Sequence, residues 1–111
     1  MSYELKARDE AVYENELRGF LPSKLFDAHV HFFDPSCFVP GTSFPPTHPY
    51  SKVDCTFGPS DYLEWAADAL PGVEIAANGF GHPGFESDRD ATAAYAGRVS
   101  DNQQFYGLAL V

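Results

Sequence analysis

Residues 25–31 read Leu-Phe-Asp-Ala-His-Val-His, an apolar run that ends in two histidines separated by one residue. Side chains alternate between the two faces of a β-strand, so we expect His29 and His31 to project from one face. Asp27 is expected on that same face, below the pair. Neutral imidazole is a good ligand for zinc, iron, nickel and copper, so the spacing predicts half of a transition-metal site. The alternative is two unrelated histidines near the end of a strand.

Length and composition indicate one small globular domain. The chain has 111 residues, of which 44% are apolar and 21% are charged. A chain of this size can bury a genuine hydrophobic core. The net charge is −9, and the seven basic residues are scattered along the sequence. Binding to phosphates requires clustered lysine and arginine, so we expect no nucleic-acid partner.

The sequence also predicts no membrane partner. No run approaches the roughly 18 apolar residues that a membrane-spanning helix needs. Residues 1–10 are polar and lack the apolar segment of a secretory signal. We therefore expect a cytoplasmic protein in which Cys37 and Cys55 are reduced, with a disulfide between them as the alternative.

Residues 1–21 are expected to form a helical arm on a body made by residues 22–111. A charged helix is predicted over residues 3–18, with Gly19 at the position of a C-cap glycine. Pro22 prevents the helix from continuing. The apolar stripe of this helix is imperfect and consists of Leu5, Val12, Tyr13 and Leu17.

The body reads as strand, helix, strand, helix, strand. The strands are predicted at residues 24–31, 73–77 and 105–111, and the helices at residues 61–70 and 88–101. Ser60 and Ser87 are the expected N-caps. The expected buried faces are Leu63, Ala66, Ala67 and Leu70 on the first helix, and Thr92, Tyr95, Ala96 and Val99 on the second.

A long irregular segment separates the first strand from the first of these helices. Residues 33–59 contain six prolines, which exclude regular structure over most of this length. A loop this long inside a compact domain is usually functional, for example as a lid or as a pocket wall. Its aromatic residues are expected to pack the loop down or to line a pocket.

Apolar strands that alternate with amphipathic helices predict an α/β fold with parallel strands, right-handed crossovers and both faces of the sheet covered. The sequence ends at Val111, inside the third predicted strand. We interpret this as part of a larger fold. A bare apolar strand at the edge of a sheet also predicts association of copies into a homo-oligomer through exposed sheet edges.

Residues 26–32, Phe-Asp-Ala-His-Val-His-Phe, resemble the Asp-x-His-x-His signature that closes the first barrel strand in the amidohydrolase superfamily. The similarity is to the amidohydrolase-related branch, also called amidohydrolase 2, and extends over residues 17–111. It includes Leu-Arg-Gly-Phe-Leu-Pro at 17–22, Asp-Tyr-Leu-Glu-Trp at 61–65, a glycine-rich turn after the second strand, and Gly-Leu-Ala-Leu-Val at 107–111.

This resemblance implies a fold and an activity. It implies the first three strands and two helices of a TIM (β/α)8 barrel, whose chemistry lies at the carboxyl ends of the strands. His29 and His31 match the pair that usually ligates a divalent metal, most often zinc. The metal would activate water for attack on a small-molecule lactone, ester or amide.

The resemblance leaves alternatives open. A non-oxidative decarboxylase of the same superfamily would use the same histidine pair, and a non-catalytic interaction module is a third possibility. The family's later histidines and its catalytic aspartate have no counterpart in the 111 residues. We therefore expect the isolated chain to be incomplete for catalysis.

Other residues are weaker candidates for the site. His82 follows the second predicted strand and is expected to contact substrate or the metal, or else to be a surface histidine in a turn. Asp27 is expected to support the strand or to orient a ligand. His48, in the proline-rich segment, favours a structural role, and nothing in the sequence places a base beside Cys37. The glycines after the second strand do not form a phosphate loop, because no Gly-Lys-Ser/Thr follows them.

Overall fold

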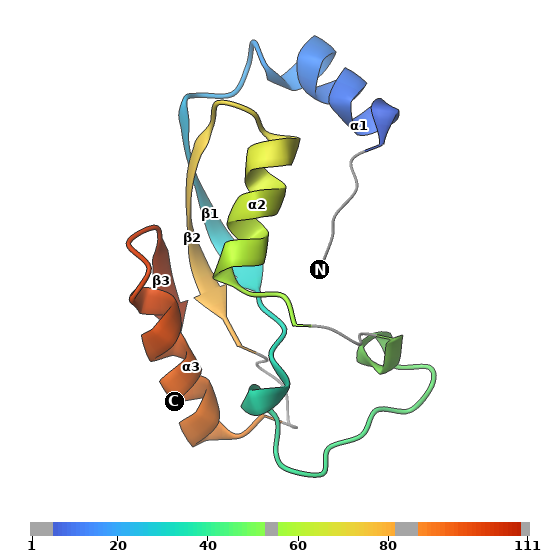
Figure 1. Ribbon diagram of the computed structural model, residues 1–111, viewed down its shortest axis with the longest axis vertical. Helices are drawn as coiled ribbons and strands as arrows, with labels where there is room; N and C mark the ends of the chain where they lie inside the picture. Colours follow the sequence, from blue (N-terminus) through green and yellow to red (C-terminus); the bar gives the residue numbers. More distant parts are fainter. Residues whose placement is uncertain (1–5, 53–55, 82–86, 110–111) are drawn as a thin grey trace.

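The computed structural model describes residues 6–52, 56–81 and 87–109. Within these residues the chain forms a parallel sheet of strand order β1-β2-β3. The strands are β1 Lys24–His31, β2 Glu74–Phe80 and β3 Phe105–Leu108, and the α-helices are α1 Ala7–Val12, α2 Pro59–Ala69 and α3 Arg89–Ser100 (Figure 1). The predicted α/β class with parallel strands is confirmed.

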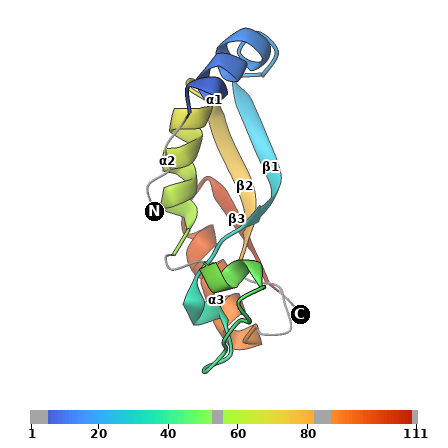
Figure 2. The ribbon, with the colours of Figure 1, turned by 90° about the vertical axis from the view of Figure 1, so that its right-hand side faces the viewer.

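Helices α2 and α3 lie against the same face of the sheet (Figure 2). The prediction that both faces are covered is therefore wrong for the described residues. The strand order explains the difference. When sequential parallel strands are neighbours and every crossover has the same hand, each helix returns on the same side. The opposite face, which we call the open face, leaves Phe26 53% exposed and Tyr106 61% exposed.

Phe32 occupies the centre of the core between the sheet and the two helices. It follows β1 directly and is only 2% exposed. A Cβ atom at Gly79 would overlap the ring of Phe32, so the glycine makes room for it. Aromatic rings from every side surround it at centroid distances of 5.6–6.5 Å, namely Phe57, Tyr62, Tyr95 and Phe105.

Strand β2 is longer than predicted. The glycine-rich turn expected directly after residue 77 begins later, because Asn78, Gly79 and Phe80 continue the ladder to β3. Strand β1 spans the predicted residues, whereas β3 ends at Leu108 and residues 110–111 lie outside the described part of the chain.

The buried face of α3 is confirmed, and that of α2 needs a correction. All four residues predicted for α3 are buried. On α2 the buried residues are Tyr62 and Ala66, whereas Ala67 is exposed and Leu63 and Leu70 are partly buried. The helix is turned toward Tyr62, because this large ring packs edge-on against Phe32.

Both helices of the body begin at caps other than the predicted serines. Gly58 is the N-cap of α2, and its N–H donates to Oδ2 of Asp61 at 2.8 Å. Asp88 is the N-cap of α3, and its Oδ1 accepts from the N–H of Ala91 at 2.9 Å. A carboxylate in the first turn also interacts favourably with the helix dipole.

The amino-terminal arm is a short helix that ends in a wider turn. Helix α1 passes into a π-helical turn over Tyr13–Leu17, so the helix predicted over residues 3–18 is irregular where it is described. Tyr13 is 6% exposed, and its hydroxyl donates to the carbonyl of Pro71 at 2.5 Å. This contact joins the arm to the turn after α2. Gly19 does not adopt a positive φ, so it is not the predicted left-handed C-cap.

The proline-rich segment packs on its own aromatic residues. Phe33 and Phe57 form an antiparallel bridge that closes most of the segment into a loop. Within it, two short 3-10 turns lie at Pro35–Cys37 and Pro49–Lys52. The rings of Phe38, Phe44 and Tyr50 pack in edge-on and tilted contacts, with centroids 5.2–6.3 Å apart. No helix in the described ranges combines the length and the apolar character that crossing a membrane requires.

Two glycines provide a matched test of how α3 packs on β3. A Cβ atom at Gly107 would overlap the backbone carbonyl of Ala96, whereas one at Gly97 would meet nothing within 4 Å. We expect Gly107→Ala to lower the free energy of unfolding by about 2–3 kcal/mol, because α3 would have to move off the sheet. Gly97→Ala should raise it by up to about 1 kcal/mol, because alanine favours the helix. Urea unfolding of both variants measures this, and similar effects of the two would contradict the described packing.

Candidate functional site

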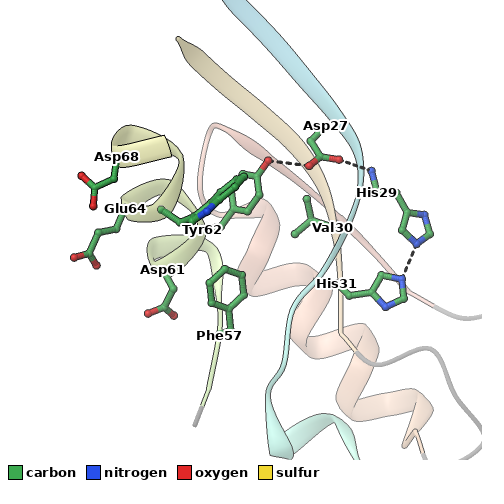
Figure 3. Close-up of a pocket in the computed structure, with 10 residues that line it drawn as sticks. Asp27, His29, Val30, His31, Phe57, Asp61, Tyr62, Glu64 and Asp68 are labelled. Atoms are coloured by element: carbon green, nitrogen blue, oxygen red, sulfur yellow. Dashed lines mark hydrogen bonds between the residues drawn. The ribbon is translucent and has the colours of Figure 1, made fainter. Parts of the chain in front are cut away.

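A bulge in β1 shapes the candidate site. Asp27 pairs with Ala77 and Val30 pairs with Gly79, so β1 uses one more residue than β2 over this interval. The extra residue reverses the alternation of side chains along the strand. As a result, Asp27 and Val30 both face the helices although they are three residues apart (Figure 3).

His29 and His31 lie together on the open face, as their spacing predicts. Their Nε2 atoms are 2.6 Å apart, and both side chains are exposed (Figure 3). An N···N contact requires one nitrogen to carry the proton and the other to accept it. The two rings also lie beside Phe80 of β2, at centroid distances of 4.7 and 5.6 Å. The pair stands at the carboxyl end of β1.

The prediction that Asp27 shares the face of the histidines is wrong, because the bulge places it on the helix side. There Oδ2 of Asp27 accepts a hydrogen bond of 2.9 Å from the hydroxyl of Tyr62. Oδ1 accepts one of 3.0 Å from the backbone N–H of His29. Burial, together with the hydrogen bond to Asp27 and its negative charge, raises the pKa of Tyr62. The hydroxyl of Tyr62 therefore keeps its proton and donates.

A pocket of about 460 Å³ lies between β1 and α2 (Figure 3). Strand β1 is at the edge of the sheet, so the pocket borders this edge. Aromatic rings form part of its wall, and three carboxylates of α2 point away from the histidines. The lining residues are Asp27, His29, Val30, His31, Phe57, Asp61, Tyr62, Glu64, Trp65 and Asp68.

The histidine pair does not by itself supply enough ligands for a complete metal site in the described part of the chain. No third histidine, cysteine, aspartate or glutamate joins the pair among residues 6–52, 56–81 and 87–109. Catalytic zinc takes three protein ligands at about 2.0–2.1 Å from nitrogen, which places two tetrahedral imidazole nitrogens about 3.3 Å apart. The two rings would therefore have to separate from their contact of 2.6 Å to hold such an ion.

The other candidate residues do not join the pair in the described structure. His82 and Cys55 lie outside the described residues, so their predicted roles stay predictions. His48 stacks on Phe44 at 4.6 Å within the proline-rich segment. Cys37 is fully buried behind Gly81.

Two residues of the pocket wall, Tyr62 and Trp65, were not among the predicted site residues. Tyr62 bonds to Asp27, and Trp65 lies in contact with Tyr62 on the wall of the pocket. Both belong to the segment Asp-Tyr-Leu-Glu-Trp of α2. A tyrosine on the buried side of a helix requires a polar partner for its hydroxyl, and this was the available signal.

Comparison with models of protein families, with curated protein sequences and with solved structures found no match for this chain. A functional assignment must therefore be argued from the geometry of the site and from the resemblance in residues 26–32.

Asp61, a pocket residue in the first turn of α2, provides a test of how this helix is stabilised at its start. The hydrogen bond from the Gly58 N–H lowers the pKa of Asp61. A lowered pKa in the folded state means that the charged carboxylate stabilises the fold above its unfolded pKa of about 3.9 and loses this effect as the pH falls further. We expect Asp61→Ala to cost about 1 kcal/mol at pH 7.

The difference in unfolding free energy between Asp61→Ala and the unmodified chain should shrink as the pH is lowered below about 4. The control is Asp68→Ala on the last turn of α2, where a negative charge opposes the helix dipole and its removal should be neutral or slightly stabilising. A cost of Asp61→Ala that does not change with pH would show that its charge plays no part.

Proposed function

We propose that this chain forms the amino-terminal, metal-binding part of a TIM-barrel hydrolase that acts on a lactone, an ester or an amide. The observation that carries the proposal is the convergence of the Nε2 atoms of His29 and His31 at the carboxyl end of a parallel strand. Chemistry in parallel α/β folds takes place at that end of the sheet.

The arrangement of the layers supports the same proposal. In a (β/α)8 barrel every helix lies outside the strands, and the side chains of the inner face fill the barrel. Here α2 and α3 share one face of the sheet (Figure 2), and the histidines stand on the other (Figure 3). The exposed apolar residues of the open face, such as Phe26 and Tyr106, would then be interior residues of a larger barrel.

Within the described residues, His29 and His31 could supply two ligands to a metal ion. No third ligand stands beside them there. His29 and His31 would hold the ion through Nε2, and bound zinc lowers the pKa of water to about 7. Further ligands must come from outside the described residues, where His82 is the candidate within this chain. No general base is assigned, because Asp27 faces away from the pair and is bonded to Tyr62.

Titration of the 111-residue chain with Co²⁺ tests the proposal. We expect weak binding, seen in the visible absorption of Co²⁺, that His29→Ala and His31→Ala each reduce at least about tenfold by removing one of two ligands. His48→Ala is the matched control and should leave binding unchanged, because His48 stacks on Phe44 in the loop. Absence of binding to the unmodified chain would contradict the proposal.

Two further observations distinguish the alternatives. The proposal predicts that the reading frame downstream of Val111 continues with more strand–helix units and further histidines, whereas an immediate stop codon would favour a non-catalytic module. If the complete protein releases CO₂ from a carboxylate substrate without consuming water, the reaction is a decarboxylation and the hydrolase assignment is wrong.

A further inference from the structure

We infer that Tyr62 is a positioning residue for the histidine pair and that it acts through Asp27. The inference rests on the proposed metal-binding role of His29 and His31 and adds to it a route by which helix α2 sets the geometry of the pair. Tyr62 itself does not lie against the imidazoles, so its effect must pass through the strand (Figure 3).

Two hydrogen bonds connect the helix to the site. The hydroxyl of Tyr62 donates to Oδ2 of Asp27 at 2.9 Å, and the N–H of His29 donates to Oδ1 of the same carboxylate at 3.0 Å. Asp27 therefore uses one oxygen for α2 and the other for the backbone of a residue in the pair. The three groups form a continuous connection from the helix to His29.

The second hydrogen bond, from His29 to Asp27, lies where the pairing between β1 and β2 is interrupted. Ladder pairing between β1 and β2 is interrupted between Asp27 and Val30, and His29 lies within this interruption. An aspartate that accepts the N–H two residues ahead forms a local turn that holds the backbone in place. The carboxylate of Asp27 therefore fixes the peptide from which the ring of His29 projects.

The core holds Tyr62 in place. Tyr62 is 4% exposed, and its ring lies 6.4 Å from Phe32, 5.8 Å from Phe105 and 5.6 Å from Trp65. A ring packed on three sides cannot follow a moving carboxylate, so the hydroxyl is a fixed point for Asp27. Positioning of the imidazoles by this fixed point is expected to matter for a metal, because groups that orient metal ligands typically contribute about 10–100-fold to affinity.

The test is a Co²⁺ titration of Tyr62→Phe, which removes the hydroxyl and keeps the ring. We expect Co²⁺ to bind about tenfold more weakly than to the unmodified chain. The matched control is Tyr95→Phe. Tyr95 also packs a buried ring against Phe32, but it belongs to α3, whereas the partner of Asp27 is Tyr62 of α2. The Tyr95→Phe variant should bind Co²⁺ as tightly as the unmodified chain. Thermal unfolding checks that both variants are folded.

A double-mutant cycle tests whether Tyr62 acts through Asp27. Asp27→Ala should weaken binding at least as much as Tyr62→Phe, and the double variant should be no weaker than Asp27→Ala alone. Hydrogen exchange of the His29 amide, measured without metal, should become faster in Tyr62→Phe and stay unchanged in Tyr95→Phe. A purely structural role of Tyr62 in the core would not change this amide selectively.

The results that would overturn the role of Tyr62 differ from the result that would overturn the proposed function. The inference is overturned if folded Tyr62→Phe binds Co²⁺ as tightly as the unmodified chain, if Tyr95→Phe loses as much affinity, or if the effects of Tyr62→Phe and Asp27→Ala are additive. If the unmodified chain binds no Co²⁺, the proposed function fails. Faster exchange of the His29 amide in Tyr62→Phe would then still demonstrate the connection from α2 to the strand.

Discussion

One additional residue in β1 determines which side chains share each face of the sheet. With regular alternation, Asp27 and the two histidines would lie on one face, and a carboxylate would stand beside the histidine pair. The bulge separates them. It directs Asp27 toward α2, where Tyr62 binds it, and leaves the imidazoles on the open face with Phe80. Asp27 therefore takes part in the packing between β1 and α2, and the two exposed imidazoles remain together on the other face.

The carboxylates of α2 near the pocket are also separated from the histidine pair. The chain carries a net charge of −9, yet the three pocket carboxylates of α2 point away from the histidines, and that of Asp27 on β1 is bonded to Tyr62 (Figure 3). At the start of the sheet Lys24 and Glu74 pair with each other at 3.4 Å across the two strands. The two exposed imidazoles lie beside the ring of Phe80.

Local patterns predicted the elements well and their relative placement less well. The apolar run of residues 24–31 and the stripe of α3 were sufficient to predict β1 and the buried face of that helix. The pattern Asn78-Gly79 indicated a turn, but Gly79 continues β2 because the ring of Phe32 fills the space above it. Packing also sets the orientation of α2, because the ring of Tyr62 packs against Phe32 and brings this side of the helix toward the core. A bulge depends on pairing between strands that are distant in sequence, so spacing within β1 alone could not predict where Asp27 points.

Trp65 has a practical significance that its packing against Tyr62 does not by itself suggest. It is the single tryptophan of the chain, and it lies on the wall of the pocket beside β1. Its partly buried indole therefore makes tryptophan fluorescence, excited at a wavelength that the six tyrosines do not absorb, a report on one location. Occupation of the pocket, or a shift of α2 against the strand, would change its emission without an added label. The molecule thus contains its own optical probe next to the site.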